Sequence, residues 1–435
     1  MLVKIFGGIM AICMFFMSFS QNAIPETAAM KFSQDDSFSP VLRFVVSSDS
    51  HIKKLGDNGC QRIVKMLKAG YAAAEADKNH NTLDAALMLG DITDFGLPTS
   101  FAAAKESVKT VLKDETDFLA VAAKNHDGYL GRVNRLYVSS ISGDKADFHK
   151  VINGCHFIGL SSSANIFVHY SEKQLKWLDK QLAEAVAADP EKPVFVFHHE
   201  HVKDTVYGSS SVDTWGVEFF TDILKKYPQV IDFSGHSHYP ANDPRSVWQG
   251  EFTAFNDGGL SYYELTVDGR NCQHPEGSDN MAHMLLVEVD AQNRVRVRVC
   301  DLNAEEVLAE YLVDNVTEPV KTKYSHETRK AAAKAPVFTA EPKADVSGRD
   351  VKITADAAQA AEGDVVFIYR LEIFNEKGES VQTANKLSDY YKTLESAGVE
   401  FNITLESAGK YTAKIVAEDV WEAASEPVSV EFTVK

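Results

Sequence analysis

The sequence predicts an α/β fold followed by an all-β domain. Between residues 40 and 300, short apolar runs typical of buried strands alternate with segments whose apolar residues recur at helical spacing. Beyond residue 337 the helical spacing gives way to short alternating runs such as Val351–Thr354 and Val428–Phe432, which is the pattern of a β-sandwich. At 435 residues the chain is long enough for two domains.

The individual elements follow from spacing and from turn signals. A helix beginning after Ser171 carries a capping box, because Gln174 stands three residues beyond that serine. A hairpin is expected near residues 284–299, and a linker at 325–336. Residues 136–161 have the pattern of further strands. The other expected strands span 42–46, 85–89, 118–122, 193–197 and 230–234, and the other helices 59–78, 99–113 and 216–226.

The first twenty residues have the pattern of a signal peptide. Lys4 supplies a positive charge, Ile5–Met17 is apolar, and Ser18–Ser20 offers small residues for cleavage. The apolar run is shorter than the roughly 20 residues that a membrane-spanning helix needs, which favours cleavage over anchoring. We therefore expect a mature chain from about Gln21 that has no transmembrane segment and is secreted, periplasmic or held at the cell surface.

Charge and cysteine content narrow the function classes. A net charge of −18 argues against general nucleic-acid binding, because phosphate backbones are held mainly by Lys and Arg. Beyond the signal, Cys60, Cys155, Cys272 and Cys300 can pair in three ways that the sequence does not separate. Their spacing does not favour a thiolate zinc site. Cys155 and Cys300 lie in strand-like runs and have an alternative reading as buried apolar residues.

Each of five predicted strands is followed by side chains that bind metals. In open α/β sheets ligands bind at the carboxyl ends of the strands. Mixed imidazole and carboxylate ligands suit Fe, Zn, Mn or Co better than Ca or Mg alone. Two such cations about 3.5–4 Å apart can activate a bridging hydroxide for displacement at phosphorus. In chain order the candidates are Asp49 and His51, Asp91, Asn125 and His126, His198 and His199, and His236 and His238.

Each of these motifs alone could be an ordinary turn, a loop or a histidine that is hydrogen-bonded within the protein. Their order along the chain is the stronger evidence for a metal site. Asp-x-His, Gly-Asp, Asn-His-Asp, a His pair and Gly-His-x-His together resemble the calcineurin-like metallophosphoesterases over roughly residues 40–260. The resemblance implies a four-layer double β-sandwich flanked by helices over residues 21–325. An Ig- or fibronectin type III-like sandwich would follow at 337–435.

The resemblance also implies roles for individual residues. His126 would face the substrate without binding metal, and would stabilise the phosphoryl oxygens or protonate the leaving group. Asp91 would bridge both cations and would therefore be catalytic as well. One cation would be held by Asp49, His51, Asp91 and His238, and the other by Asp91, Asn125, His198 and His236.

Three positions depart from the family pattern. Lys124 replaces the usual Gly before Asn-His; if that position needs positive φ, Lys costs on the order of 1 kcal/mol, and its charge has an alternative use against a substrate phosphate. His198 is preferred as ligand over His199 because it directly follows the strand, and His201 has an alternative reading as a substrate contact. Asp94 stands where purple acid phosphatases carry a metal-bound Tyr, so a colourless enzyme is expected.

The sequence therefore predicts an exported phosphoesterase with two divalent or trivalent metal ions, acting on a phosphorylated small molecule. Monoester and diester hydrolysis share this ligand set and are not separated. The alternative is a catalytically weak surface module whose C-terminal sandwich docks to glycan or protein. Further candidates for lining the pocket, each equally consistent with loop scaffolding, are Asp127, Tyr129, Asn242 and Tyr262.

Overall fold

The computed structural model describes residues 30–129, 134–162, 169–210, 215–318, 324–393 and 398–435. The predicted signal peptide lies outside these residues. Within them, none of the helices combines the length and the apolar character that a bilayer crossing requires. Cys60, Cys155, Cys272 and Cys300 are free thiols, and Cys155 and Cys300 are buried, as their strand-like surroundings predict.

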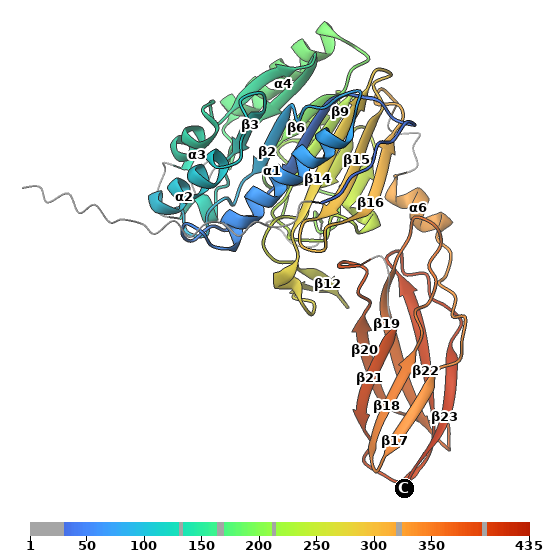
Figure 1. Cartoon of the computed structure of the whole chain (residues 1–435). Helices are drawn as coiled ribbons and strands as arrows, with labels where there is room; N and C mark the ends of the chain where they lie inside the picture. Colours follow the sequence, from blue (N-terminus) through green and yellow to red (C-terminus); the bar gives the residue numbers. More distant parts are fainter. Residues whose placement is uncertain (1–29, 130–133, 163–168, 211–214, 319–323, 394–397) are drawn as a thin grey trace, which may run out of the picture.

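Two six-stranded sheets form the N-terminal part of the chain (Figure 1). The first has the order β16 (Glu306–Val313), β15 (Val295–Asp301), β14 (His283–Asp290), β1 (Pro40–Ser47), β2 (Ala85–Leu89) and β3 (Asp117–Val121). The second has the order β10 (Val247–Gln249), β11 (Thr253–Asn256), β9 (Val230–Ser234), β6 (Val194–Phe197), β5 (Cys155–Gly159) and β4 (Phe148–Ile152).

The two sheets share one core. Phe44 of β1 meets Phe157 of β5 and Phe195 of β6 edge-on, with ring centroids 4.9 Å apart in both pairs. Alternate residues of the strands face this core, because successive side chains of a strand point to opposite faces. Fully burying one such ring contributes about 1.5–3 kcal/mol, so the aromatic layer accounts for much of the adhesion between the sheets.

Helices cover the outer faces of both sheets. The face of the first sheet that carries Val45 and Met88 packs against α1 (Asn58–Ala76) and α2 (Pro98–Lys109). The face of the second sheet that carries Val196 packs against α4 (Glu172–Ala188) and α5 (Thr221–Leu224). The result is a mixed α/β body in which helices flank two packed sheets.

Parallel pairing sets the position of the strand ends. In the first sheet β1, β2 and β3 are parallel neighbours. In the second, β5, β6, β9 and β11 are parallel neighbours in that order. Because parallel strands end at the same edge, the loops after β1, β2, β3, β6 and β9 gather at one end of the double sheet.

Two predictions about helices are partly wrong. Within residues 136–161, which were expected to be strands, the structure has α3 (Asn134–Ser142) before β4 and β5. Tyr137 of α3 stacks on Phe101 of α2 with ring centroids 5.1 Å apart, so tertiary packing stabilises a helix where a strand was expected. The helix expected at 216–226 is only α5, preceded by β8 (Gly216–Val217), which pairs with β7 (His201–Val202). The capping box of α4 is present as predicted.

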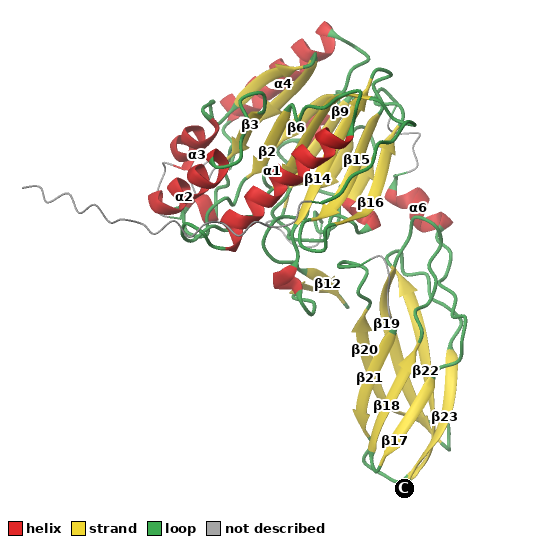
Figure 2. Ribbon diagram, viewed as in Figure 1, coloured by secondary structure: helices red, strands yellow, loops and turns green. Residues whose placement is uncertain are grey.

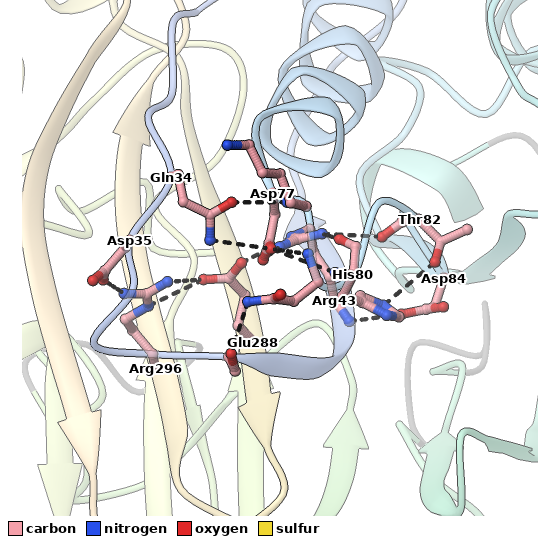
Figure 3. A network of polar contacts seen from close by, with 12 residues as sticks. Gln34, Asp35, Arg43, Asp77, His80, Thr82, Asp84, Glu288 and Arg296 are labelled. Atoms are coloured by element: carbon pink, nitrogen blue, oxygen red, sulfur yellow. Dashed lines mark hydrogen bonds and ion pairs between the residues drawn. The ribbon is translucent and has the colours of Figure 1, made fainter.

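A buried ion-pair network joins the N-terminal segment to the first sheet (Figure 3). Arg43 of β1, only 1 % exposed, donates to Glu288 of β14 at 2.8 Å and to Asp77 after α1 at 2.7 Å. Arg296 of β15 donates to the same Glu288 at 2.6 Å and also contacts Asp35. The guanidinium groups are therefore fully matched by carboxylates, which is the condition under which burial of charge is tolerated.

Residues 343–434 form a separate pair of antiparallel sheets (Figure 2). The core between these sheets includes Ile353, Tyr369 and Ile415. One sheet has the order β17 (Lys343–Ser347), β18 (Asp350–Ala355) and β21 (Val399–Thr404). The other has the order β20 (Ser380–Leu387), β19 (Val366–Asn375), β22 (Gly409–Asp419) and β23 (Val428–Val434).

The segment expected to be a linker contains a short helix, α6 (His326–Ala332), at the junction between the two parts (Figure 1). The loop after β9 meets the sandwich directly. Tyr390 donates its hydroxyl to Asp243 at 2.8 Å, and Arg245 stacks on Tyr207 and Phe367. A small hairpin of β12 (Leu265–Val267) and β13 (Arg270–Gln273) adds an ion pair between Asp268 and Arg370 at 2.9 Å.

Candidate metal centre

Seven of the sequence-predicted side chains follow strand ends that meet at one edge of the double sheet. Their ligand atoms fall into three overlapping groups, within each of which the atoms lie no more than 4.8 Å apart. The groups are Asp49, His51 and His238; His51, Asp91 and His126; and Asp91, His199 and His236. The first and second groups share His51, and the second and third share Asp91, so the structure brings the loops of both sheets to a single centre.

The first group is built around Asp49, which is fully buried. Its Oδ1 lies 3.3 Å from Nε2 of His238 and 3.7 Å from Nε2 of His51. The two histidine Nε2 atoms are 3.2 Å apart. Nδ1 of His238 contacts the carbonyl of Tyr262 at 2.9 Å, so the ring donates there and keeps Nε2 for a ligand. Three donor atoms therefore face one point.

The third group, which contains His199 and His236, is built around Asp91, which is 1 % exposed. Oδ2 of Asp91 lies 3.2 Å from Nε2 of His199, whose Nδ1 donates to the carbonyl of Leu89 at 2.7 Å. Asn125 follows β3 and begins a short 3-10 turn at His126–Gly128. Its Oδ1 is buried without a hydrogen-bond partner in the part of the chain that the structure describes.

The structure corrects one sequence-based choice, since His199 and not His198 faces Asp91. Both ring nitrogens of His198 are occupied elsewhere, by Asp232 at 2.7 Å and by the carbonyl of Glu200 at 2.6 Å. The physical reason is the two-residue period of a strand. Phe195 and Phe197 face the core between the sheets, so His199 continues that face and His198 points to the helix side, where its ring contacts Phe220.

The backbone of the centre is held in an uncommon conformation. Asp49, His51, Asp91, His236 and His238 all have positive φ, between 45° and 72°. Left-handed backbone at residues other than glycine costs roughly 1–3 kcal/mol each and persists only where the surroundings enforce it. Five such residues in one centre are what a site that orients ligands requires, because the strain fixes where each side chain points.

Glycine allows the loops to approach so closely. A Cβ atom at Gly90 would lie 2.8 Å from the ring of His199, and one at Gly235 would lie 2.0 Å from Oγ of Ser48. The Gly-Asp and Gly-His motifs therefore owe their glycines to the contact between the two sheets. With this space, the backbone N–H of His236 donates to Oδ2 of Asp49 at 2.9 Å.

The donor set fits a pair of cations. Oδ1 of Asp49, Oδ1 of Asp91 and Oδ1 of Asn125 are all buried acceptors without a hydrogen-bond partner among the described residues, and buried polar groups are normally paired. Carboxylate, amide and imidazole donors together match Fe, Zn, Mn or Co. The chemistry of the residues therefore agrees with the expected metals, and Asp91 belongs to two of the three groups.

The electrostatics point the same way. Burial opposes a charge on His199, but Asp91 and Asp49 raise its pKa well above the ordinary value. Burial likewise opposes ionisation of Asp49, yet the nearby His238 and His199 hold the pKa of that carboxyl well below its usual range. The carboxylates of Asp49 and Asp91 therefore stabilise a positive charge between them, as they would stabilise a bound metal cation.

His126 lies at the mouth of the centre with a side chain 26 % exposed. Its Nδ1 donates to the carbonyl of Asp94 at 2.9 Å, which leaves Nε2 for an incoming group. The ring packs edge-on against His51 at 4.4 Å and lies 5.0 Å from the exposed ring of Tyr129. On the opposite side, Tyr262 stacks on His238 at 4.1 Å. Tyr129 and Tyr262 are thus the two pocket candidates that border the centre.

The other candidates support the loops. Asp127 is buried and accepts from the N–H groups of Thr93 at 2.9 Å and Ala123 at 3.1 Å; burial and the charge of Asp91 raise its pKa to about 7. Asn242 donates to the carbonyl of Tyr390 in the sandwich. His201 is hydrogen-bonded at both nitrogens, to Ser234 and Ser237, and so does not reach a substrate.

Two further features were missed or misjudged from the sequence. Asp257, directly after β11, contacts Oγ of Ser48 at 2.6 Å, and burial and the charge of Asp49 raise its pKa well above the ordinary value. The sequence could have indicated Asp257, because this polar residue directly follows β11, another strand of the parallel set. Lys124 is not among the described non-glycine residues with positive φ, so the backbone penalty considered for it does not arise.

Comparisons with known proteins give one sequence match and several structural ones. No family model matches the chain. A probable cyclic nucleotide phosphodiesterase from Rhodococcus erythropolis is 28 % identical over 163 residues, which are 36 % of this chain and 52 % of that protein. The chain therefore spans about half the length of the curated relative that it matches.

Among solved structures, a purple acid phosphatase from yellow lupin aligns with 65 % of this chain and 56 % of its own, at 10 % identity and a TM-score of 0.43. The sixth fibronectin type III domain of human fibronectin type III domain containing protein 3 aligns with 23 % of this chain and 88 % of its own, at 17 % identity and a TM-score of 0.19.

Proposed function

We propose that the chain is an exported metal-dependent phosphoesterase with a two-cation centre. The observation that carries the proposal is the group of buried, unpartnered oxygens of Asp49, Asp91 and Asn125 among imidazoles from both sheets. The sequence likeness to a protein described as a probable cyclic nucleotide phosphodiesterase supports the reaction class. Residues 337–435 would be an Ig- or fibronectin type III-like sandwich attached to the enzyme.

The ligand assignment follows the geometry, with His199 in place of His198. Asp49, His51, Asp91 and His238 would hold one cation, and Asp91, Asn125, His199 and His236 the other. Bound divalent or trivalent cations would lower the pKa of a water and polarise the phosphoryl oxygens. Asp91 would be shared by the two cations, since it belongs both to the group with His51 and to the group with His199.

His126 would act on the substrate itself. Its Nδ1–H is held by the carbonyl of Asp94, so Nε2 is the atom left for the substrate. To act as an acid, the ring would carry a second proton on Nε2. From there it would donate to a phosphoryl oxygen or to the departing alkoxide. The carboxylate of Asp94 lies 3.7 Å from the same Nδ1. Substrates of either ester class, a phosphomonoester or a phosphodiester, are compatible with this set.

The experiment is turnover of an aryl phosphate monoester and the matching diester by the purified chain after loading with Mn or Zn. Metal content is measured in parallel by mass spectrometry. Hydrolysis of either ester, lost in Asp91→Ala and in His126→Ala, supports the proposal. Fewer than one equivalent of metal together with no turnover contradicts it, and would favour the alternative of a binding module.

A further inference from the structure

Lys124 stands next to the proposed ligand Asn125 in the chain, where the family pattern has glycine. Its Nζ hydrogen-bonds to Nε2 of His169. Nδ1 of His169 in turn lies 3.6 Å from Oε1 of Glu200, the residue after His199. We propose that Lys124, positioned by His169, contacts an additional negative oxygen of the substrate and makes the enzyme select phosphomonoesters over phosphodiesters. The inference rests on the proposed function.

The charge of Lys124 is not neutralised by its partner. An ammonium has three donors and no acceptor, so Nε2 of His169 must accept from it. The single proton of a neutral imidazole then resides on Nδ1, directed at Glu200. His169 therefore separates Lys124 from the carboxylate while holding its Nζ in place, and the positive charge is kept for another anion.

Glu200 is held by the protein, but its charge still acts on Lys124: burial lowers the pKa of the Lys124 ammonium, and Glu200 raises it. Glu200 is 3 % exposed, and its Oε2 accepts the hydroxyl proton of Tyr170 at 2.6 Å. By contrast Lys53, another lysine at the mouth, lies 3.5 Å from the carboxylate of Asp94 and is 67 % exposed. Of these two lysines, Lys124 is the more enclosed and is the one whose direct partner is uncharged.

This arrangement favours one ester class over the other. Near neutral pH a phosphomonoester carries close to two negative charges, because its second pKa is about 6. A diester replaces one charged oxygen with a second ester group and carries a single charge. A fixed ammonium beside the centre therefore stabilises the monoester more, while a diester would place a neutral ester oxygen or its substituent against it.

The test compares Lys124→Met, Lys124→Arg and His169→Phe with the parent chain, and uses Lys53→Met as the matched control. Each metal-loaded protein is assayed for kcat/KM on an aryl phosphate monoester and on the diester of the same aryl alcohol. Lys124→Met is expected to lower monoester kcat/KM about 10- to 100-fold. Diester kcat/KM should change by less than about fivefold.

The positioning role of His169 has its own readout. His169→Phe keeps the charge of Lys124 but removes its partner, so monoester KM should rise while kcat falls less. Lys124→Arg should recover part of the monoester preference, because the charge is restored. Equal losses for both esters in Lys124→Met, or an unchanged ratio of the two, would overturn the proposal.

A binding measurement separates failure of this inference from failure of the proposed function. Inorganic phosphate is titrated by calorimetry into the Mn-loaded parent chain and into Lys124→Met, with metal content checked by mass spectrometry. Weaker phosphate binding in Lys124→Met at equal metal content supports the contact, even if neither ester is turned over. Equal phosphate affinities, or no phosphate binding by the metal-loaded parent, would contradict it.

Discussion

Nε2 of His199 lies 3.2 Å from Oδ2 of Asp91, although the two residues follow strands of different sheets. This contact joins the ends of β2 and β6 and closes the candidate centre. It also makes His199 the proposed ligand of the His198–His199 pair, because both ring nitrogens of His198 have partners elsewhere. Replacing His199 by alanine and replacing His198 by alanine should therefore have opposite effects on metal content.

His199→Ala should remove at least one equivalent of bound metal and turnover with it, because Asp91 loses its imidazole neighbour. His198→Ala should keep its metal but destabilise the chain, since Asp232 would be left without its buried partner at 2.7 Å. Such a loss typically costs about 1–3 kcal/mol. Metal content and chemical denaturation are the two measurements. Metal loss in His198→Ala with full retention in His199→Ala would reverse the assignment.

Asp91→Ala should abolish ester hydrolysis and reduce the bound metal from two equivalents to one or fewer. The reason is that Asp91 belongs both to the group with His51 and to the group with His199. Its loss would therefore remove a ligand from each of the two cations. Metal analysis and turnover after Mn loading are measured on the same samples. Asp222→Ala, at an exposed carboxylate on α5, is the control and should behave as the parent. Full turnover by Asp91→Ala would show that the bridging role is wrong.

His126→Ala should lower kcat by about 10²- to 10⁴-fold, the usual effect of losing a general acid, with both metals retained. Its ring contacts the centre but is partly exposed and held through Nδ1 by a carbonyl, so its removal leaves the ligands in place. Rate and metal content are compared. His274→Ala, with a side chain 56 % exposed and close to Tyr262, provides a histidine control. A loss of metal in His126→Ala would instead make it a ligand.

Glu288→Gln should destabilise the chain by about 3 kcal/mol at pH 7, because Arg43 and Arg296 would lose the carboxylate they share. Burial opposes ionisation of Glu288, but Arg298, Arg296 and Arg43 lower its pKa below the ordinary 4.5. Its stabilising effect is therefore fully present above pH 4.5 and is lost as the pH falls through the lower folded-state pKa.

The measurement is urea denaturation of the parent and Glu288→Gln between pH 7 and pH 3. The difference in free energy of unfolding should narrow at the acidic end. Glu306→Gln, at an exposed position of β16, should match the parent throughout. A difference that stays constant with pH would mean that the ionised form of Glu288 is not what stabilises the network.

Local pattern determined much of this protein. Apolar runs and helical spacing predicted β1, β2, β3, β6 and β9, and the capping box predicted α4, because these signals depend on neighbours along the chain. The motifs placed Asp49, His51, Asp91, His236 and His238 at strand ends, and parallel pairing then brings strand ends together. The order of the motifs by itself predicts a phosphoesterase.

Only the tertiary structure shows which face of a strand a side chain occupies and which distant residues it contacts. Position after a strand does not say which side a residue faces; Phe195 and Phe197 in the shared core show that His199 is the inward one. The packing of Tyr137 on Phe101 stabilises the helix α3 in a segment for which the sequence predicted a strand. The contact between Lys124 and His169, residues 45 apart in sequence, is likewise invisible to local pattern. Long-range packing therefore selects between alternatives, such as His198 or His199 at the centre, that the spacing of residues along the chain does not distinguish.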